Sequence, residues 1–316
     1  MAQMYMKNLV CRIKIYLSNP KKLVSSIIKI FFSIIGGVYT LFEIHDSVFS
    51  GKDWIDWFSG YFYLFCIGSL IISIVFSIEW KTSFSCLVKD YDITISLKMG
   101  DVTRKKSAVV IPTNSSFVIT KENRCIADDS VQGAYQNRYF RKKEGELSRL
   151  LEKALRLEEC HDEHLLLFGI PYPIYDIGTT AVIEYKTKVS YWVAINDFNE
   201  FGQNKKAKID DLYKALNGLW NSIKDKGHVE KELCIPLIAS GHAGIAEATR
   251  GQVIEAIIDS FLVTIVNNKF KIADHLSIVL FPPDLDKIDL NREKEYLKYK
   301  CSFINKVDTK CTGVLI

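Results

Sequence analysis

Residues Leu233–Phe261 read LCIPLIASGHAGIAEATRGQVIEAIIDSF, and the order of residue types in this stretch decides the fold. A short apolar run ends in Ser240-Gly241-His242-Ala243-Gly244, and an amphipathic helix follows it. Glycines let a backbone approach an anion, loop N–H groups point toward it, and the dipole of the next helix favours its charge. The stretch therefore predicts a strand, a phosphate-binding loop and a helix. The alternative is an ordinary strand-to-helix turn that binds nothing.

Strands and helices alternate on both sides of this stretch. Apolar runs predict strands, and a helical period predicts helices between them. This alternation predicts an α/β domain with a mixed, mostly parallel central sheet and helices on both faces. Ligands of such sheets bind beyond the carboxyl ends of the strands, where the glycine loop lies. The predicted strands are 92–98, 107–111, 165–168, 189–195, 233–238 and 276–281, and the predicted helices are 144–159, 210–224 and 246–266.

Two further segments have a less regular pattern. Residues 123–139 (NRCIADDSVQGAYQNRY) predict a long loop, and long loops in compact domains are often functional. Residues 284–316 show no role in the sheet, although 291–300 has the pattern of a short helix.

The N-terminal part of the chain has a different composition. Residues 23–44 are almost wholly apolar, and residues 57–78 carry no charge. About 20 apolar residues suffice to cross a bilayer core. The first run starts too late and is too long for a cleaved signal peptide. These runs predict a transmembrane hairpin within residues 1–84, followed by a ligand-binding domain over 85–316. A pair of buried core helices is the alternative.

The charges that flank the two runs predict their orientation. Lys7, Arg12, Lys14, Lys21 and Lys22 precede the first run, whereas the connecting loop 45–56 has Lys52 as its only Lys or Arg. Positive segments stay inside, so the sequence predicts a multi-pass protein of the inner (plasma) membrane with both termini cytoplasmic. The net charge of +4 lies mainly in the N-terminal arm, which favours lipid headgroups over nucleic acid as the partner.

The eight cysteines form no CxxC pair, so in a reducing cytoplasm we expect them to be unpaired. Cys160, His161 and His164 lie close together in the sequence, but they lack the second pair of ligands that a structural zinc site needs. We expect no bound metal and no resident cofactor.

Three segments are expected to meet at one pocket. Gly100-Asp101-Val102 follows the first strand, Asn114 ends the next, and Pro236–Ile245 contains the glycine loop. A carboxylate after a strand can accept a hydrogen bond from an adenine amino group, and an asparagine can bond ribose hydroxyls. Each signal alone is weak, because Gly-Asp pairs and glycine loops are common in turns.

Together these segments resemble the macro domain, a module that binds ADP-ribose. The stretches GDVTRKKSAVVIPTN and IPLIASGHAGIAEATRGQVIEAIIDS are similar to its adenine-contacting acid, its Asn-bearing strand end and its second phosphate loop. Residues 190–220 are closer to the macro-like sensor of Thoeris antiphage effectors, a branch that includes forms with a two-span membrane anchor. The resemblance covers Gly100 to about Leu285.

The resemblance implies roles for named residues. Asp101 would contact adenine, Asn114 the distal ribose, and Ser240–Ile245 the phosphates. The expected ligand-binding set is Asp101, Val102, Asn114, Gln132, Gly133, Ser240, Gly241, His242, Ala243, Gly244 and Ile245.

The first phosphate loop departs from the family pattern. Enzymatic macro domains usually have a run of glycines there, whereas 128–133 reads DDSVQG. Two carboxylates would repel a diphosphate by about 1–4 kcal/mol per pair at about 4 Å. Asp128 and Asp129 would instead face a cationic group of the ligand or a partner subunit.

The resemblance implies a sensor and not an enzyme. In Thoeris systems a TIR-domain partner consumes NAD and releases an ADP-ribose-derived messenger, such as histidine-ADP-ribose, which the effector binds. We expect binding to drive homo-oligomerisation and disruption of the lipid bilayer, killing the infected cell. The runner-up is a membrane-tethered hydrolase of ADP-ribosylated substrates, with His242 as its acid or base. A scaffold membrane protein with an incidental glycine loop is the third possibility.

Overall fold

The computed structural model describes residues 20–48, 53–77, 83–122, 125–227, 229–238, 245 and 248–311. The chain divides into two compact units, 1–81 and 82–316. Each unit is described by itself.

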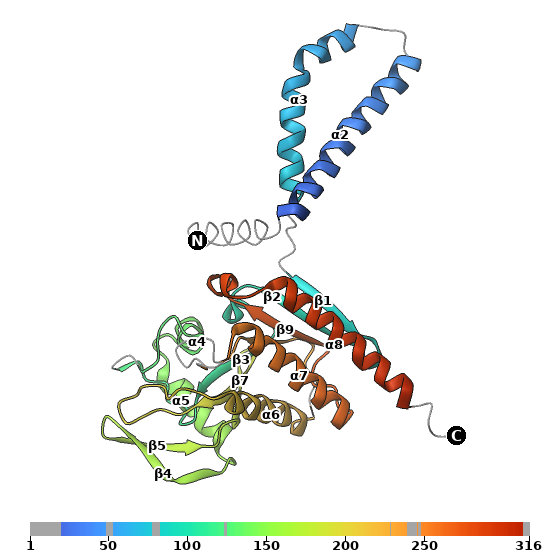
Figure 1. The fold of residues 1–316 in the computed structure, drawn as a ribbon. Coiled ribbons are helices and arrows are strands. Elements are labelled where there is room, and N and C mark those ends of the chain that lie inside the picture. Colours follow the sequence, from blue (N-terminus) through green and yellow to red (C-terminus); the bar gives the residue numbers. More distant parts are fainter. Residues whose placement is uncertain are drawn as a thin grey trace. The chain divides into compact units, whose positions relative to one another are not determined.

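The first unit contains two long helices, α2 (Pro20–Val48) and α3 (Asp53–Ser77), which contact each other as an antiparallel pair (Figure 1). The window Val24–Leu41 of α2 is long and apolar enough to cross a membrane, and none of it is buried. In α3 the apolar stretch Gly60–Phe76 is shorter. A buried core helix would be covered, so the exposed apolar surface of α2 fits a membrane anchor.

Three hydroxyl groups in these helices, those of Ser33, Thr40 and Ser73, bond to their own backbone. Ser33 Oγ donates to the Lys29 carbonyl at 2.8 Å, and Ser73 Oγ donates to the Ser69 carbonyl at 2.6 Å. Hydrocarbon offers no water to a hydroxyl, so internal bonds of this kind suit helices that lie in lipid.

A seven-stranded sheet organises the second unit. Its order is β1-β2-β9-β8-β3-β7-β6, and the five central strands from β2 to β7 run parallel. Strands β1 and β6 are antiparallel at the two edges. The mostly parallel sheet predicted from the sequence is therefore confirmed. The strands are β1 (Ser83–Val88), β2 (Ile93–Met99), β3 (Ala108–Asn114), β6 (Thr180–Tyr185), β7 (Lys188–Asn196), β8 (Leu233–Pro236) and β9 (His275–Leu280).

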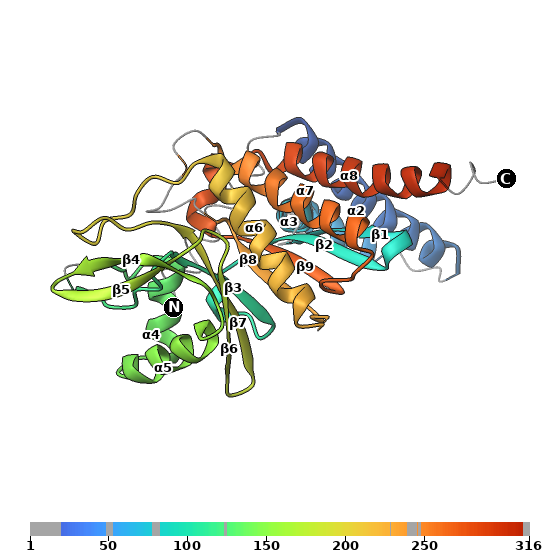
Figure 2. The same cartoon turned by 90° about the horizontal axis from the view of Figure 1, so that it is seen from below.

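Helices cover both faces of this sheet (Figures 1 and 2). Three helices, α6 (Ile209–Asp225), α7 (Arg250–Asn268) and α8 (Leu290–Cys311), pack side by side on one face. Two helices, α4 (Val131–Tyr139) and α5 (Glu144–Leu155), pack on β3 and β6 on the other face.

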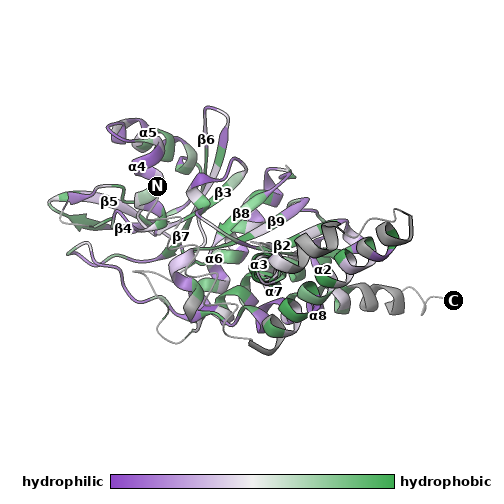
Figure 3. Ribbon diagram, turned by 90° about the horizontal axis from the view of Figure 1, so that it is seen from above, coloured by the Kyte–Doolittle hydropathy of each residue, from purple (hydrophilic) through white to green (hydrophobic). Residues whose placement is uncertain are grey.

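Successive side chains along each strand point to opposite faces of the sheet and pack into the hydrophobic core on each face. Trp192 of β7 packs edge-to-face on Tyr135 of α4, with ring centroids 5.9 Å apart. On the opposite face Trp220 of α6 meets Phe261 of α7 at 5.4 Å, and its ring N–H donates to Ser260. Figure 3 shows hydrophobic residues along central strands such as β3 and β8, as burial on both faces requires.

The structure differs from the sequence prediction in several segments. Residues 131–139, expected to belong to a long loop, form α4, because its N-cap Ser130 accepts a hydrogen bond from the Gly133 N–H. The C-terminal helix α8 spans 290–311 and is much longer than the expected 291–300, because it packs on α7 and β1. A separate hairpin, β4 (Cys160–Leu167) and β5 (Ile170–Tyr175), also stands where one short strand was expected.

Candidate ligand-binding site

A cavity of about 810 Å³ opens at the carboxyl ends of the parallel strands. Ligand pockets are typically about 300–1,000 Å³, so its size suits a dinucleotide-like molecule. All five parallel strands contribute residues at or just beyond their carboxyl ends. These residues are Gly100–Thr103 after β2, Pro112–Asn114 of β3, Ile195 and Asn196 of β7, Pro236 and Leu237 of β8, and Phe281 after β9. The cavity thus lies where parallel sheets generally bind ligands.

Asp101 lies at the wall of this cavity and caps the short helix η2 (Val102–Arg104). Its Oδ1 accepts hydrogen bonds from the Thr103 N–H at 2.9 Å and the Thr103 hydroxyl at 2.7 Å. Its Oδ2 lies 3.1 Å from Arg104 Nε. These bonds fix the carboxylate in one orientation, and Oδ2 keeps a lone pair for a ligand donor. Val102 also lines the cavity and is buried.

Asn114 is buried at the cavity, but its side chain serves the chain itself. Its Oδ1 accepts from the N–H groups of Ser116 and Val118, and its Nδ2 donates to the Val118 carbonyl. These bonds hold the turn that includes Phe117, whose φ is +49°. The amide keeps one N–H for a ligand, so the distal-ribose contact stays a prediction while the structural role is plain.

The start of α4 forms the neighbouring wall of the cavity. Gln132 is buried and donates to the Val118 carbonyl at 2.9 Å. Gly133 is pressed against the preceding loop, because a Cβ there would lie 2.1 Å from the Ala127 carbonyl oxygen. Gly133 is therefore required by packing, whatever ligand the loop contacts.

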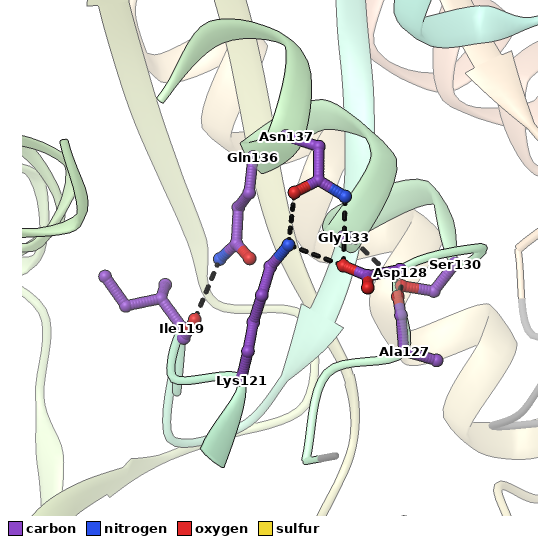
Figure 4. Close-up of polar contacts among 8 residues, drawn as sticks. All are labelled: Ile119, Lys121, Ala127, Asp128, Ser130, Gly133, Gln136 and Asn137. Carbon is purple, nitrogen blue, oxygen red and sulfur yellow. Dashed lines mark hydrogen bonds and ion pairs between the residues drawn. The ribbon is translucent and has the colours of Figure 1, made fainter. Parts of the chain in front are cut away.

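The two adjacent carboxylates of this loop have different surroundings. Asp128 lies 2.6 Å from Lys121 Nζ and accepts from Asn137 at 2.9 Å, as Figure 4 shows. The hydrogen bond from Lys121, and then that from Asn137, lower the pKa of Asp128. Asp129 lines the cavity, whereas Asp128 does not. The expected repulsion of a diphosphate at this wall therefore concerns Asp129 alone.

The predicted second phosphate loop falls outside the described residues at Ser240, Gly241, His242, Ala243 and Gly244. Ile245 is described and buried, and it is not among the residues that line the cavity. Helix α7 begins soon afterwards with a capping box, in which the Thr249 hydroxyl accepts from the Gln252 N–H and the Gln252 side chain accepts from the Thr249 N–H.

Several cavity residues were missed in the sequence. Arg250, the first residue of α7, lies 2.7 Å through Nη2 from Oδ1 of Asp284. Phe281 directly follows β9, and Phe201 lies in the loop after β7, with 49% and 67% of their surfaces exposed. At a cavity, exposed rings offer stacking surfaces for a planar group. An aromatic residue directly after an apolar strand was the available signal for Phe281.

The loop that carries Phe201 is well organised. Asn199 Oδ1 accepts from the N–H groups of Phe201 and Gln203, and Asn196 donates to Asn204 at 2.6 Å. Gly202 has a φ of +72°, and a Cβ there would lie 2.3 Å from the sulfur of Cys125. Cys125 also lines the cavity, and burial raises the pKa of its thiol, which keeps it protonated and poorly nucleophilic.

The described residues include no cluster of three or more His, Cys, Asp or Glu that could hold a metal ion. His161, from the sequence cluster considered for zinc, instead lies 2.9 Å through Nε2 from Asp176 Oδ1. The described residues at the cavity provide fixed polar groups, exposed aromatic rings and one guanidinium.

The second unit is similar in sequence to proteins of one known family. Residues 95–281 match the family model of the Thoeris protein ThsA macro domain. The chain is 26% identical over 213 residues to the Thoeris protein ThsA of Bacillus amyloliquefaciens, an alignment that covers 65% of this chain and 68% of that protein. The macrodomain of Oceanobacillus iheyensis, solved with ADP and with MES bound, has 12% identity and a TM-score of 0.43 in both structures. That alignment covers 71% of this chain and 97% of the macrodomain. Since the family model spans more than half of the chain, the chain belongs to the Thoeris ThsA macro-domain family.

Proposed function

We propose that the chain is a membrane-anchored effector of a Thoeris antiphage system that binds an ADP-ribose-derived messenger in the cavity. The observation that carries the proposal is the cavity itself, at the carboxyl ends of five parallel strands in a ThsA-type macro domain. Asp101 offers an acceptor for an adenine amino group, Phe281 a stacking surface, and Arg250 a positive charge. The messenger is an ADP-ribose conjugate such as histidine-ADP-ribose, made by a TIR-domain partner.

A titration tests the binding step. The full chain in detergent is titrated with ADP-ribose, its histidine conjugate, cyclic forms and NAD, and thermal unfolding is recorded with each. A ligand at 100 times its Kd should stabilise the fold by about 2.7 kcal/mol. A scaffold protein with an incidental cavity would show no such stabilisation by any of these nucleotides, and that outcome would remove the proposal.

The role of Asp101 is tested with a change in the ligand. The carboxylate accepts a hydrogen bond from the adenine amino group, which hypoxanthine lacks. Wild type should prefer ADP-ribose over its hypoxanthine analogue, and Asp101→Ala should lose that preference. Asp90→Ala, in the turn between β1 and β2, is the matched control and should keep it. An equal preference in all three proteins would contradict this assignment.

The protein is proposed to bind its ligand without converting it to a product. Incubating wild type with ADP-ribose conjugates and following the products by mass spectrometry tests this. A product whose formation is lost in His242→Ala or Asp129→Ala, with binding retained, would favour the hydrolase alternative.

The anchor is proposed to cross the inner (plasma) membrane twice, with both termini in the cytoplasm. The support is the flanking charge and the apolar character of α2 and α3. A cysteine introduced as Ser50→Cys should react with a membrane-impermeant maleimide added outside the cell. Labelling only after lysis would contradict this topology.

Assembly of clustered anchors is the proposed output. Gly36 and Gly37 of α2 have open space where a Cβ would be, so another helix can approach the backbone closely there. The ligand can drive assembly only through a higher affinity for the assembled state. Gly36→Leu should abolish a ligand-dependent increase in oligomer size, whereas Val24→Leu on the same helix should not.

A further inference from the structure

The charges around the cavity are a poor match for a diphosphate. Among the described residues that line it, Asp101, Asp129 and Asp284 are acidic and Arg250 is the one basic residue. In a partly buried site two like charges at about 4 Å repel by roughly 4 kcal/mol. Among these described residues, Arg250 is therefore the one that offers a positive charge to a dianionic ligand.

That guanidinium is engaged by a carboxylate of the same cavity. Arg250 Nη2 lies 2.7 Å from Asp284 Oδ1, and the two side chains are 20% and 22% exposed. Asp284 lies in η4 (Pro282–Lys287), where its own N–H donates to the Phe281 carbonyl at 2.9 Å. The pair joins the start of α7 to the segment that follows β9.

Phosphate and carboxylate compete for a guanidinium because both present oxygens to the same planar fork of N–H donors. We propose that Arg250 binds a phosphate of the nucleotide ligand, and that Asp284 is the internal counterion which the phosphate displaces. This inference rests on the proposed function, since it assigns the charge recognition of that same cavity.

The exchange makes the site selective for strongly anionic ligands. A neutral nucleoside has no group that competes with Asp284, so it gains nothing from Arg250. A diphosphate replaces the carboxylate and gains the charge-assisted hydrogen bonds, while the loss of the Arg250–Asp284 pair lowers its net affinity. Asp284 thus weakens diphosphate binding in wild type and leaves nucleoside binding unchanged.

The test compares Asp284→Asn, Arg250→Gln and Arg250→Lys with wild type, as full chains in detergent, by calorimetric titration with adenosine, AMP and ADP. Asp284→Asn should bind ADP about 3- to 10-fold more tightly, and Arg250→Gln at least tenfold more weakly, with adenosine within about twofold in both. Arg250→Lys should fall between Arg250→Gln and wild type. Asp274→Asn is the matched control. Asp274 Oδ1 lies 2.8 Å from Lys271 Nζ, and neither residue lines the cavity.

The outcomes separate this inference from the proposed function. Wild type that binds neither ADP nor ADP-ribose contradicts the proposed function. If wild type binds ADP, and Asp284→Asn binds ADP with the same or a lower affinity, the exchange alone is overturned. A parallel loss of adenosine and ADP binding in Arg250→Gln also overturns it, since Arg250 would then support the fold or the adenine. If Arg250→Gln fails to fold, the Asp284→Asn and Arg250→Lys titrations decide.

Discussion

Replacing Gly133 by alanine should destabilise the domain and damage the cavity together. The new Cβ would lie 2.1 Å from the Ala127 carbonyl oxygen, and an ordinary contact begins at 3.4 Å. The obstacle is backbone, so the first turn of α4 or the Ala127–Ser130 loop must move by about 1.3 Å. Overpacking of this kind costs about 1–3 kcal/mol, and the better helix propensity of alanine offsets up to about 1 kcal/mol.

We expect a net cost of about 2 kcal/mol for Gly133→Ala, which lowers the Tm of a domain of this size by about 4–8 °C. Tryptophan fluorescence is a suitable probe, because the Trp192 ring packs on Tyr135 of the same helix. Affinity for ADP-ribose should also fall, since Ser130, Val131 and Gln132 line the cavity.

Gly145→Ala is the matched control for this change. Gly145 lies on the exposed first turn of α5, and nothing lies within 4 Å of the Cβ it would gain. The substitution should leave Tm unchanged or raise it slightly, with ligand affinity unaltered. If Gly133→Ala unfolds at the wild-type temperature and binds ligand equally well, the close approach of α4 to Ala127 is not as described.

For three further substitutions the structure predicts whether stability rises or falls. Burial raises the pKa of Glu293 from a usual 4.5 to about 7. The buried carboxyl must therefore ionise as pH rises between these values, and its contribution to stability is lost. Glu293→Gln should raise Tm at pH 8 and leave it unchanged at pH 4.5. Burial alone would raise the pKa of Glu232, but hydrogen bonds from Lys98 and two serines outweigh it and lower the pKa to about 2; Glu232→Gln should lower Tm at pH 7, and the difference should close as pH falls from 4.5 toward 2. Thr113 Oγ1 is buried and has no hydrogen-bond partner among the described residues, so Thr113→Val should stabilise the unliganded protein by about 1 kcal/mol. A fall in Tm would reveal an unrecognised hydroxyl contact.

The core of the fold was predictable because its strands are buried on both faces. The continuous apolar runs at 107–111 and 233–238 are what such strands require, and they form β3 and β8. Helix α4 was missed for the opposite reason. Its buried residues are Gln132, Gly133, Tyr135 and Gln136, which give no apolar period to detect. Its polar side chains are buried because they bond to backbone carbonyls of the preceding loop, such as those of Val118 and Ile119.

The position of the cavity was predictable from the sequence, whereas the chemistry of its lining was predictable only in part. Strand ends that carry Asp101 and Asn114 do meet at one cavity, because the carboxyl ends of parallel strands share an edge. The Asn114 side chain accepts from the N–H groups of Ser116 and Val118 because the backbone turns back over it after β3. The identities of these residues alone do not reveal that backbone conformation.

The charge pattern shows most directly why a sequence reading of the site falls short. Asp128 and Asp129 are adjacent and looked equivalent, yet one pairs with Lys121 and the other lines the cavity. Arg250 and Asp284 are 34 residues apart and looked unrelated, yet they form an ion pair within that cavity. Neighbours in a chain can face opposite sides of a turn, whereas the ends of parallel elements converge. The electrostatic character of the pocket therefore depends on topology, and the net charge of a loop is a poor guide to the ligand that the loop will accept.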